Sequence, residues 1–228
     1  MLIFHNQNLP QNAKSALSLY GETVDFSAPG LVYEAVNGHP DLFMVQGGKE
    51  LTVAPNIPGH YLEFLSERKI QFRIGHIPVG FHYPQSARYN AVITEKYFIH
   101  NLNISDLLLL EQSSHLEKIH VNQGYTRCSL LALGGTDFIT SDKGIYQILQ
   151  ENGLQVLCTD PTEIKLPGFS HGFFGGTCGV WHKTVFILGS MKYHAQGEEI
   201  RKFIGKAGYD LTELYDGPLF DGGSIFFI

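Results

Sequence analysis

Two cysteines and a histidine are the residues of this chain whose types suit covalent chemistry. Cys128 and Cys178 each open a predicted strand, and His171 lies in a loop of glycine and aromatic residues. A thiol attacks carbon as the thiolate, so it needs a nearby cation, which Arg127 or His171 could supply. The imidazole could also carry a proton or contact a ligand. Cys128, Cys178 and His171 are therefore the candidate catalytic residues, and the alternative is that both thiols are buried and inert.

Polar side chains also stand at or near the starts of other predicted strands. The carboxylate of Asp41, in the sequence His39-Pro40-Asp41, could pair bidentately with a guanidinium or amine ligand. The alternative is an ordinary turn carboxylate ahead of a strand. The candidate ligand-binding residues are His39, Asp41, Asn90, Arg127, Thr177 and Asp221.

The elements that must position these residues repeat along the chain. Residues 128–157 read as strand, turn, strand, helix and strand, with Ser141 as the expected helix N-cap and Gly153 in the left-handed position after the helix. Other segments repeat this order, one of them with a turn at Gly47-Gly48. A further unit is assembled from both termini, which removes two exposed sheet edges at once. The expected units are 224–228 with 1–27, 40–75, 88–122, 127–158 and 177–215.

This order predicts an α/β (α+β) fold in one domain, residues 1–228, built as a pseudo-five-fold β/α propeller of strand-strand-helix-strand units closed by both termini. An ordinary α/β sandwich is the alternative. In a doubly wound sheet each strand is followed by a helix, whereas in this chain a pair of strands precedes each helix. The pairs Gly134-Gly135 and Gly175-Gly176 lie beside strands and open no helix, so nucleotide binding is not favoured.

Five such repeats resemble the pentein fold of the guanidine-modifying enzymes, the agmatine deiminase, arginine deiminase and dimethylargininase groups. Residues 222–227, Gly-Gly-Ser-Ile-Phe-Phe, resemble the glycine-rich start of the last strand, which carries the nucleophilic cysteine in that superfamily. Residues 168–173, Gly-Phe-Ser-His-Gly-Phe, resemble its His-x-Asp segment. The resemblance implies that the first strand of each unit lines a central cavity, which would place the candidate binding residues around it.

Both motifs depart from the family pattern. Phe227 occupies the place of the cysteine, and Phe173 stands where the carboxylate would be. Phenylalanine can neither attack carbon nor move a proton, so the chain resembles an uncharacterised pentein-like family without the usual C-terminal catalytic cysteine. The resemblance implies binding of a small cationic guanidine- or amine-containing ligand without ordinary pentein catalysis. Whether the chain is an enzyme stays open: the alternatives are a Cys-dependent amidinohydrolase or amidinotransferase using Cys128 or Cys178 with His171, and a protein-interaction module.

The composition of the chain indicates which classes of binding partner are not expected. With 228 residues, a net charge of -6 and scattered basic residues, the chain has no electrostatic footprint for nucleic acid or an anionic membrane. No apolar stretch approaches a membrane span, and we expect a cytoplasmic protein of unknown oligomeric state. Three cysteines without a CxxC pair, and no histidine pair at helical spacing, indicate no metal and no cofactor. Convergence of scattered histidines on zinc after folding is the minor alternative.

Overall fold

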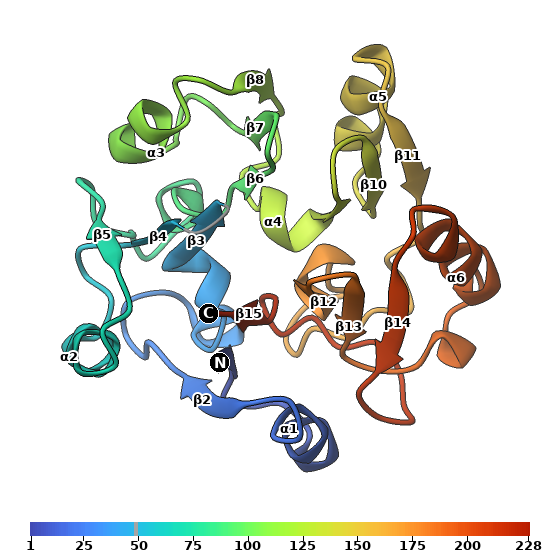
Figure 1. The fold of residues 1–228 in the computed structure, drawn as a ribbon, viewed down its shortest axis with the longest axis horizontal. Coiled ribbons are helices and arrows are strands. Elements are labelled where there is room, and N and C mark those ends of the chain that lie inside the picture. The colour runs from blue at the N-terminus through green and yellow to red at the C-terminus, as the bar shows by residue number, and fades with distance from the viewer. Residues whose placement is uncertain (48–49) are drawn as a thin grey trace.

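Five three-stranded sheets surround a central axis in the computed structural model, which describes residues 1–47 and 50–228 (Figure 1). In every sheet the first strand pairs antiparallel with the second, and the second pairs parallel with the third. A helix joins the second strand to the third and lies on the outside of the ring. The predicted propeller of strand-strand-helix-strand units is confirmed.

The bounds of the elements follow the order of the units. The unit closed by both termini holds β15 (Phe226–Phe227), β1 (Leu2–Asn6), α1 (Gln11–Leu17) and β2 (Glu22–Phe26). The second unit holds β3 (Met44–Gly47), β4 (Glu50–Val53), α2 (Gly59–Glu67) and β5 (Phe72–Ile74). The third unit holds β6 (Val92–Ile93), β7 (Tyr97–His100), α3 (Leu107–Gln112) and β8 (Glu117–His120).

The last two units are built in the same way. The fourth holds β9 (Leu130–Leu133), β10 (Asp137–Thr140), α5 (Lys143–Glu151) and β11 (Gln155–Cys158). The fifth holds β12 (Cys178–Trp181), β13 (Thr184–Ile187), α6 (Gly197–Lys206) and β14 (Asp210–Glu213). Short helices precede several first strands or lie in the connecting loops: η1 (Glu34–Val36), η2 (Pro40–Leu42), η3 (Gln85–Ala87), α4 (Thr126–Ser129), η4 (Gly175–Thr177) and η5 (Met191–Tyr193).

The two termini lie side by side and close the ring (Figure 1). Ile3 pairs with Phe227 in an antiparallel ladder, and the backbones of Leu2 and Ile228 exchange hydrogen bonds of 2.8 and 2.9 Å. All five residues of β1 are buried. The N-terminal strand β1 therefore lies in the middle of its sheet, paired on one side with the C-terminal strand β15 and on the other with β2.

Some local expectations need correction. The N-cap of α5 is Asp142 and not Ser141, because the Asp142 carboxylate accepts a hydrogen bond of 2.8 Å from the Ile145 N–H. Cys128 does not open a strand: it lies in α4, and the strand begins with the apolar run at Leu130. Gly153 has the expected positive φ of 74°. The turn expected at Gly47-Gly48 extends outside the described residues. No helix of the described ranges has the length and apolar character to cross a membrane.

A buried histidine joins two of the loops beside the axis. The Nε2 of His100, at the end of β7, lies 3.0 Å from the carbonyl oxygens of Ala87 and Gly124. Both are acceptors only, so Nε2 carries the proton and Nδ1, 2.7 Å from Ser105 Oγ, is the acceptor. Burial lowers the pKa of His100 from 6.5 to about 4, because the charged form would be desolvated.

Because the pKa of His100 is lowered by burial, we expect the protein to lose stability in mild acid. Between pH 6.5 and 4 the unfolded chain takes up a proton at His100 and the folded chain does not, so about 3 kcal/mol of the free energy of unfolding is lost by pH 4. In His100→Gln the amide can keep the same hydrogen bonds without titrating. Urea denaturation at pH 7 and pH 4 should show a smaller acid loss in this variant. The exposed control His115→Gln should behave as the wild type, and an equal acid loss in all three proteins would contradict the assignment.

Candidate functional site

Residues just before the first strands meet on the axis of the ring. Asp41 precedes β3, Asn90 precedes β6, Cys128 precedes β9 and Ser224 precedes β15. All four are at most 3% exposed. Because the first strands surround the axis, their N-terminal ends bring together residues that lie far apart in the sequence.

Hydrogen bonds join these four residues into one network. The Asp41 Oδ2 accepts from the Cys128 thiol at 2.9 Å and from the Ser224 hydroxyl at 2.9 Å. The Asn90 Nδ2 donates to the Asp41 carbonyl at 3.1 Å, and the Asn90 Oδ1 accepts from the Cys128 N–H at 3.0 Å. Asp41 and Cys128 are therefore held in fixed positions by their neighbours, as a binding site requires.

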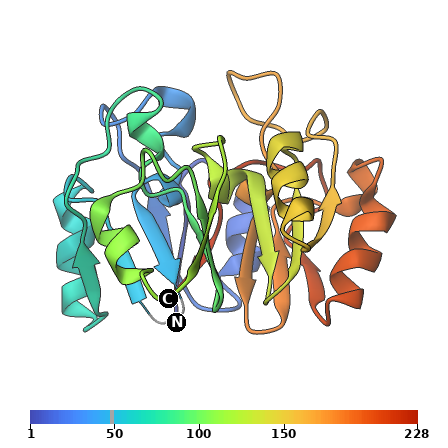
Figure 2. The same cartoon turned by 90° about the horizontal axis from the view of Figure 1, so that it is seen from above.

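A cavity of about 270 Å³ lies over this network. Its polar floor is formed by His39, Cys128 and Asp221, and Asp41 lies one side chain deeper, behind the thiol. Figure 2 shows the surrounding loops, in blue and orange, on the side of the ring away from the two termini. The remaining lining residues are Tyr33, Val36, Leu42, Tyr125, Leu166, Phe169, Ser170, His171 and Phe173.

Tyr33 and Tyr125 give the cavity an uncharged aromatic wall. Their hydroxyl groups lie 3.2 Å apart, and Tyr125 also lies 2.6 Å from Ser86 Oγ. Burial raises the pKa of both tyrosines above the ordinary value, so the hydroxyls stay protonated at neutral pH. The ring of Phe169 lies 5.9 Å from that of Tyr33 and is 53% exposed. Aromatic faces of this kind suit a flat or cationic ligand.

Asp221 is fixed by the backbone around it. Its Oδ2 accepts from the Phe173 N–H at 2.8 Å, and its Oδ1 accepts from the Gly223 N–H at 3.1 Å. Only glycine fits at position 176, since a Cβ there would lie 1.9 Å from Asp221 Oδ1. Burial raises the pKa of the Asp221 carboxyl; the nearby His39 and the hydrogen bond from the Phe173 N–H lower it, and the charge of Asp41 raises it. The loop of His171 is thus tied to the carboxylate on the cavity floor.

The site holds two buried carboxylates that form no ion pair with a lysine or arginine of the described residues. Among the described residues, neither Asp41 nor Asp221 forms an ion pair. The Asp41 Oδ1 is buried and accepts no hydrogen bond from the described part of the chain. Two negative charges in one buried region are costly unless a cation neutralises them. The arrangement is suited to binding a positive group.

The two candidate thiols differ in their surroundings. Burial raises the pKa of Cys128 well above its ordinary value, and the charges of Asp41 and Asp221 raise it further, so this thiol is protonated at neutral pH. Burial raises the pKa of Cys178 to about 12. Cys178 packs in the hydrophobic core, and the hydroxyl of the adjacent Thr177 donates to the Phe174 carbonyl at 2.7 Å.

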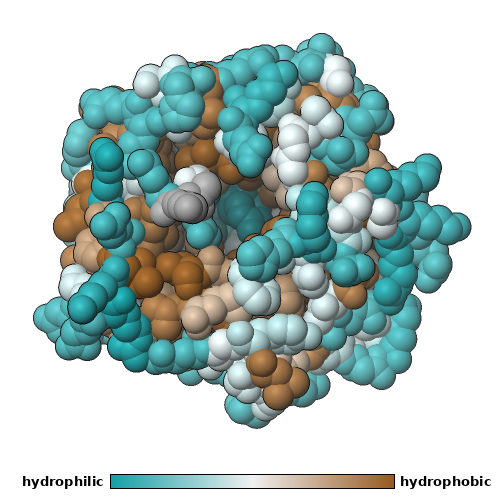
Figure 3. All heavy atoms as spheres, in the orientation of Figure 1, coloured by the Kyte–Doolittle hydropathy of each residue, from teal (hydrophilic) through white to brown (hydrophobic). Residues whose placement is uncertain are grey.

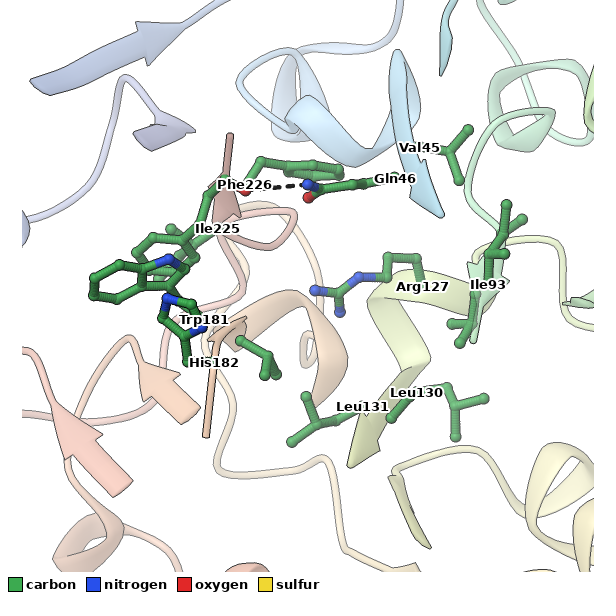
Figure 4. Close-up of a pocket in the computed structure, with 15 residues that line it drawn as sticks. Val45, Gln46, Ile93, Arg127, Leu130, Leu131, Trp181, His182, Ile225 and Phe226 are labelled. Atoms are coloured by element: carbon green, nitrogen blue, oxygen red, sulfur yellow. Dashed lines mark hydrogen bonds between the residues drawn. The ribbon is translucent and has the colours of Figure 1, made fainter. Parts of the chain in front are cut away.

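Arg127 lines a second cavity, of about 310 Å³, on the face that carries the termini. Figure 3 shows this face with a hollow at its centre, and Figure 4 shows the Arg127 side chain pointing into the space between the first strands. Its Nη1 donates to the Gly175 carbonyl at 3.3 Å. All five first strands contribute to the wall, as the pentein resemblance implies.

The structure thus divides the predicted residues into two groups. It brings His39, Cys128, His171 and Asp221 to the lining of one cavity, and it places Asp41 and Asn90 in the hydrogen-bond network behind Cys128. It places Arg127, Thr177 and Cys178 outside that cavity. Ser224 was missed by sequence reasoning, together with Tyr33 and Tyr125. A signal for Ser224 existed, because it stands two residues before its strand, as Asn90 and Cys128 do.

The architecture defines the chain as a protein of pentein fold, and solved structures share it. DDAH from Pseudomonas aeruginosa, a cysteine-to-serine mutant complexed with citrulline, aligns with a TM-score of 0.54 at 7% identity over 93% of this chain and 91% of that chain. C. jejuni agmatine deiminase with substrate bound, also a cysteine-to-serine mutant, aligns with a TM-score of 0.56 at 8% identity over 96% of this chain and 90% of that chain. Identities this low show the fold alone.

The chain belongs to a family of unknown function, DUF6873, whose model matches residues 4–226. No curated protein matches it. The resemblance to the guanidine-modifying pentein superfamily is confirmed at the level of fold.

Proposed function

We propose that this protein binds a small organic cation of the guanidinium or amine class in the cavity over His39, Cys128 and Asp221. The observation that carries the proposal is the pair of buried carboxylates, Asp41 and Asp221, for which the described residues provide no ion pair. A guanidinium group offers planar N–H donors and a charge that stays positive at neutral pH. It would neutralise Asp221 at the cavity floor and interact with the charge of Asp41 behind it.

The size and wall of the cavity support a small, flat ligand. A volume of about 270 Å³ suits a molecule of the size of an amino acid. The rings of Tyr33, Tyr125 and Phe169 line the space around the charged floor. Stacking of a guanidinium plane on such rings adds to the attraction by the carboxylates. A protein of the same fold, C. jejuni agmatine deiminase, was solved with its substrate bound, which supports the ligand class.

Binding is better supported than ordinary pentein catalysis. Phe227 is buried in the terminal sheet, where its ring lies 4.8 Å from that of Phe186. It therefore serves the core at the position where the resemblance would place the nucleophile. Cys128 is the thiol beside the cavity, and it is protonated and donates to Asp41.

A thiol-dependent enzyme is the second candidate. The Cys128 thiol lines the same cavity as His171 and is hydrogen-bonded to a carboxylate that could take its proton. A bound cation would also favour the thiolate, since an opposite charge within a few ångströms lowers the pKa of a thiol. Attack on the guanidinium carbon would then displace ammonia or an amine, and His171 would protonate the leaving group.

A thermal-shift series tests both candidates. Arginine, agmatine and methylated arginines should raise the melting temperature, and citrulline, whose side chain is neutral, should not. At about 100 times Kd, a ligand adds about 2.7 kcal/mol to the free energy of unfolding, which is roughly 5–10 °C for a chain of this size. Release of ammonia or amine from a shifting ligand would favour the enzyme. The absence of a shift with every cation would contradict the proposed function.

A further inference from the structure

Three side chains at the cavity floor and just behind it form a group with the chemistry of a metal site. One ligand atom each from His39, Asp41 and Cys128 lies within 4.8 Å of the other two, and all three residues are buried. An imidazole nitrogen, a carboxylate oxygen and a thiolate sulfur are the three donor types that proteins use for zinc. Calcium and magnesium prefer oxygen donors alone, so this mixture favours zinc.

Unpartnered atoms of the same side chains point to a missing ligand. His39 is 1% exposed, yet neither of its ring nitrogens has a hydrogen-bond partner in the described part of the chain. The same holds for the Asp41 Oδ1. Buried polar atoms are nearly always paired, because an unpaired one has lost its hydrogen bonds to water without replacement. A metal ion bound between them would satisfy the imidazole and the carboxylate together.

The surroundings hold these donors in place. Asn90 bonds the backbone of Cys128, and Ser224 bonds the Asp41 carboxylate. Gly223, with a φ of 69°, packs so closely against His39 that a Cβ there would lie 2.3 Å from the histidine side chain. Groups that orient metal ligands in this way raise the affinity of a site.

We propose that His39, Asp41 and Cys128 bind one zinc ion and that the cavity supplies its fourth position. His39 and Cys128 both line the cavity, which gives the ion a path of entry and leaves room for water or another ligand. On binding, the sulfur–hydrogen bond of Cys128 breaks, the proton leaves to solvent, and the thiolate and the Asp41 carboxylate balance the charge of the ion.

The proposal reverses the expectation of no metal drawn from the sequence, and it goes beyond the proposed function. Zinc and an organic cation both rely on the negative charge at Asp41, so they should compete for the cavity. Each proposal can still be refuted without the other, because zinc binding is measured in the absence of any organic ligand.

Titration of the chelator-treated protein with zinc, and with cobalt as a coloured probe, tests the site. We expect one equivalent of zinc to bind and about one proton to be released, and cobalt to give the near-ultraviolet absorption of a cobalt–thiolate bond. Cys128→Ser should abolish this absorption and weaken zinc binding by more than about 10-fold, since the loss even of a second-shell partner of a metal ligand costs 10–100-fold. Cys158→Ser, on β11, is the matched control and should bind as the wild type.

His39→Gln provides a second variant in case the first folds poorly, and it should also weaken zinc binding while the thiol remains. Circular dichroism of each variant confirms folding. Absence of stoichiometric zinc in the wild type, or zinc binding by both Cys128→Ser and His39→Gln as tight as that of the wild type, would overturn the proposal. Cys128→Ser keeps both carboxylates, so a retained agmatine shift in this variant supports the proposed function independently of the metal. A zinc-binding protein without any agmatine shift would remove the proposed function and leave the zinc site standing.

Discussion

Replacement of Phe227 with alanine is expected to reduce the free energy of unfolding by about 3–5 kcal/mol, the range for a buried phenylalanine. Phe227 is 7% exposed and lies in β15, opposite Ile3 of β1. Its ring packs 4.8 Å from that of Phe186 and is stacked on Trp181. The substitution therefore leaves a cavity at the point where the two ends of the chain join. Urea denaturation at pH 7 measures the loss.

Phe81 offers a matched control for the same substitution. It is 46% exposed and lies in the loop between the second and third units. Phe81→Ala should change the free energy of unfolding by less than about 0.5 kcal/mol, as substitutions away from the core do. If Phe227→Ala cost no more than Phe81→Ala, the terminal strand would not be contributing to the fold, and the closure of the ring would lose its energetic importance.

The fold could be predicted because the order strand, strand, helix, strand can be recognised in the sequence of each unit. In the fourth unit the apolar residues of α5, Ile145 and Leu149, are buried as their helical spacing indicates, and Gly153 follows the helix in the left-handed conformation. The apolar strands at both ends of the chain had no other predicted partner, so pairing them with each other was the arrangement that protects their edges. The exact first and last residues of the strands were harder to predict. The first strand of the unit expected at 88–122 has only Val92 and Ile93 in the ladder, and Asn90 just before it bonds the Asp41 carbonyl instead.

The site was only partly predictable, for a physical reason. Sequence pattern indicates which residues stand at strand starts, but not the direction of each side chain. Arg127 and Cys128 are adjacent in α4, yet they line cavities on opposite faces of the ring. Contacts such as that between Asp41 and Ser224, 183 residues apart, arise only when all the units are assembled. No local pattern reports such a contact, which is why Ser224 was missed.

Asp41→Asn is expected to separate binding from stability. The asparagine carbonyl can still accept from Cys128 and Ser224, as the Asp41 Oδ2 does. The variant removes one of the two buried negative charges that lack an ion pair in the described chain, so the ligand-free protein should become more stable. We expect a gain of roughly 1 kcal/mol, or about 2–4 °C in melting temperature.

The same substitution should remove most of the affinity for a cation. Loss of one partner from a buried charge pair costs about 2–5 kcal/mol, so the apparent Kd for agmatine should rise by at least about 30-fold. Thermal shift with and without agmatine measures both effects on one sample, and the exposed control Asp210→Asn should alter neither. An Asp41→Asn protein that is less stable than the wild type and still shifts fully with agmatine would mean that this carboxylate is a structural hydrogen-bond acceptor. A gain in stability together with a loss of binding is the result expected of a group whose charge serves a ligand, because the folded chain alone gains nothing from burying it.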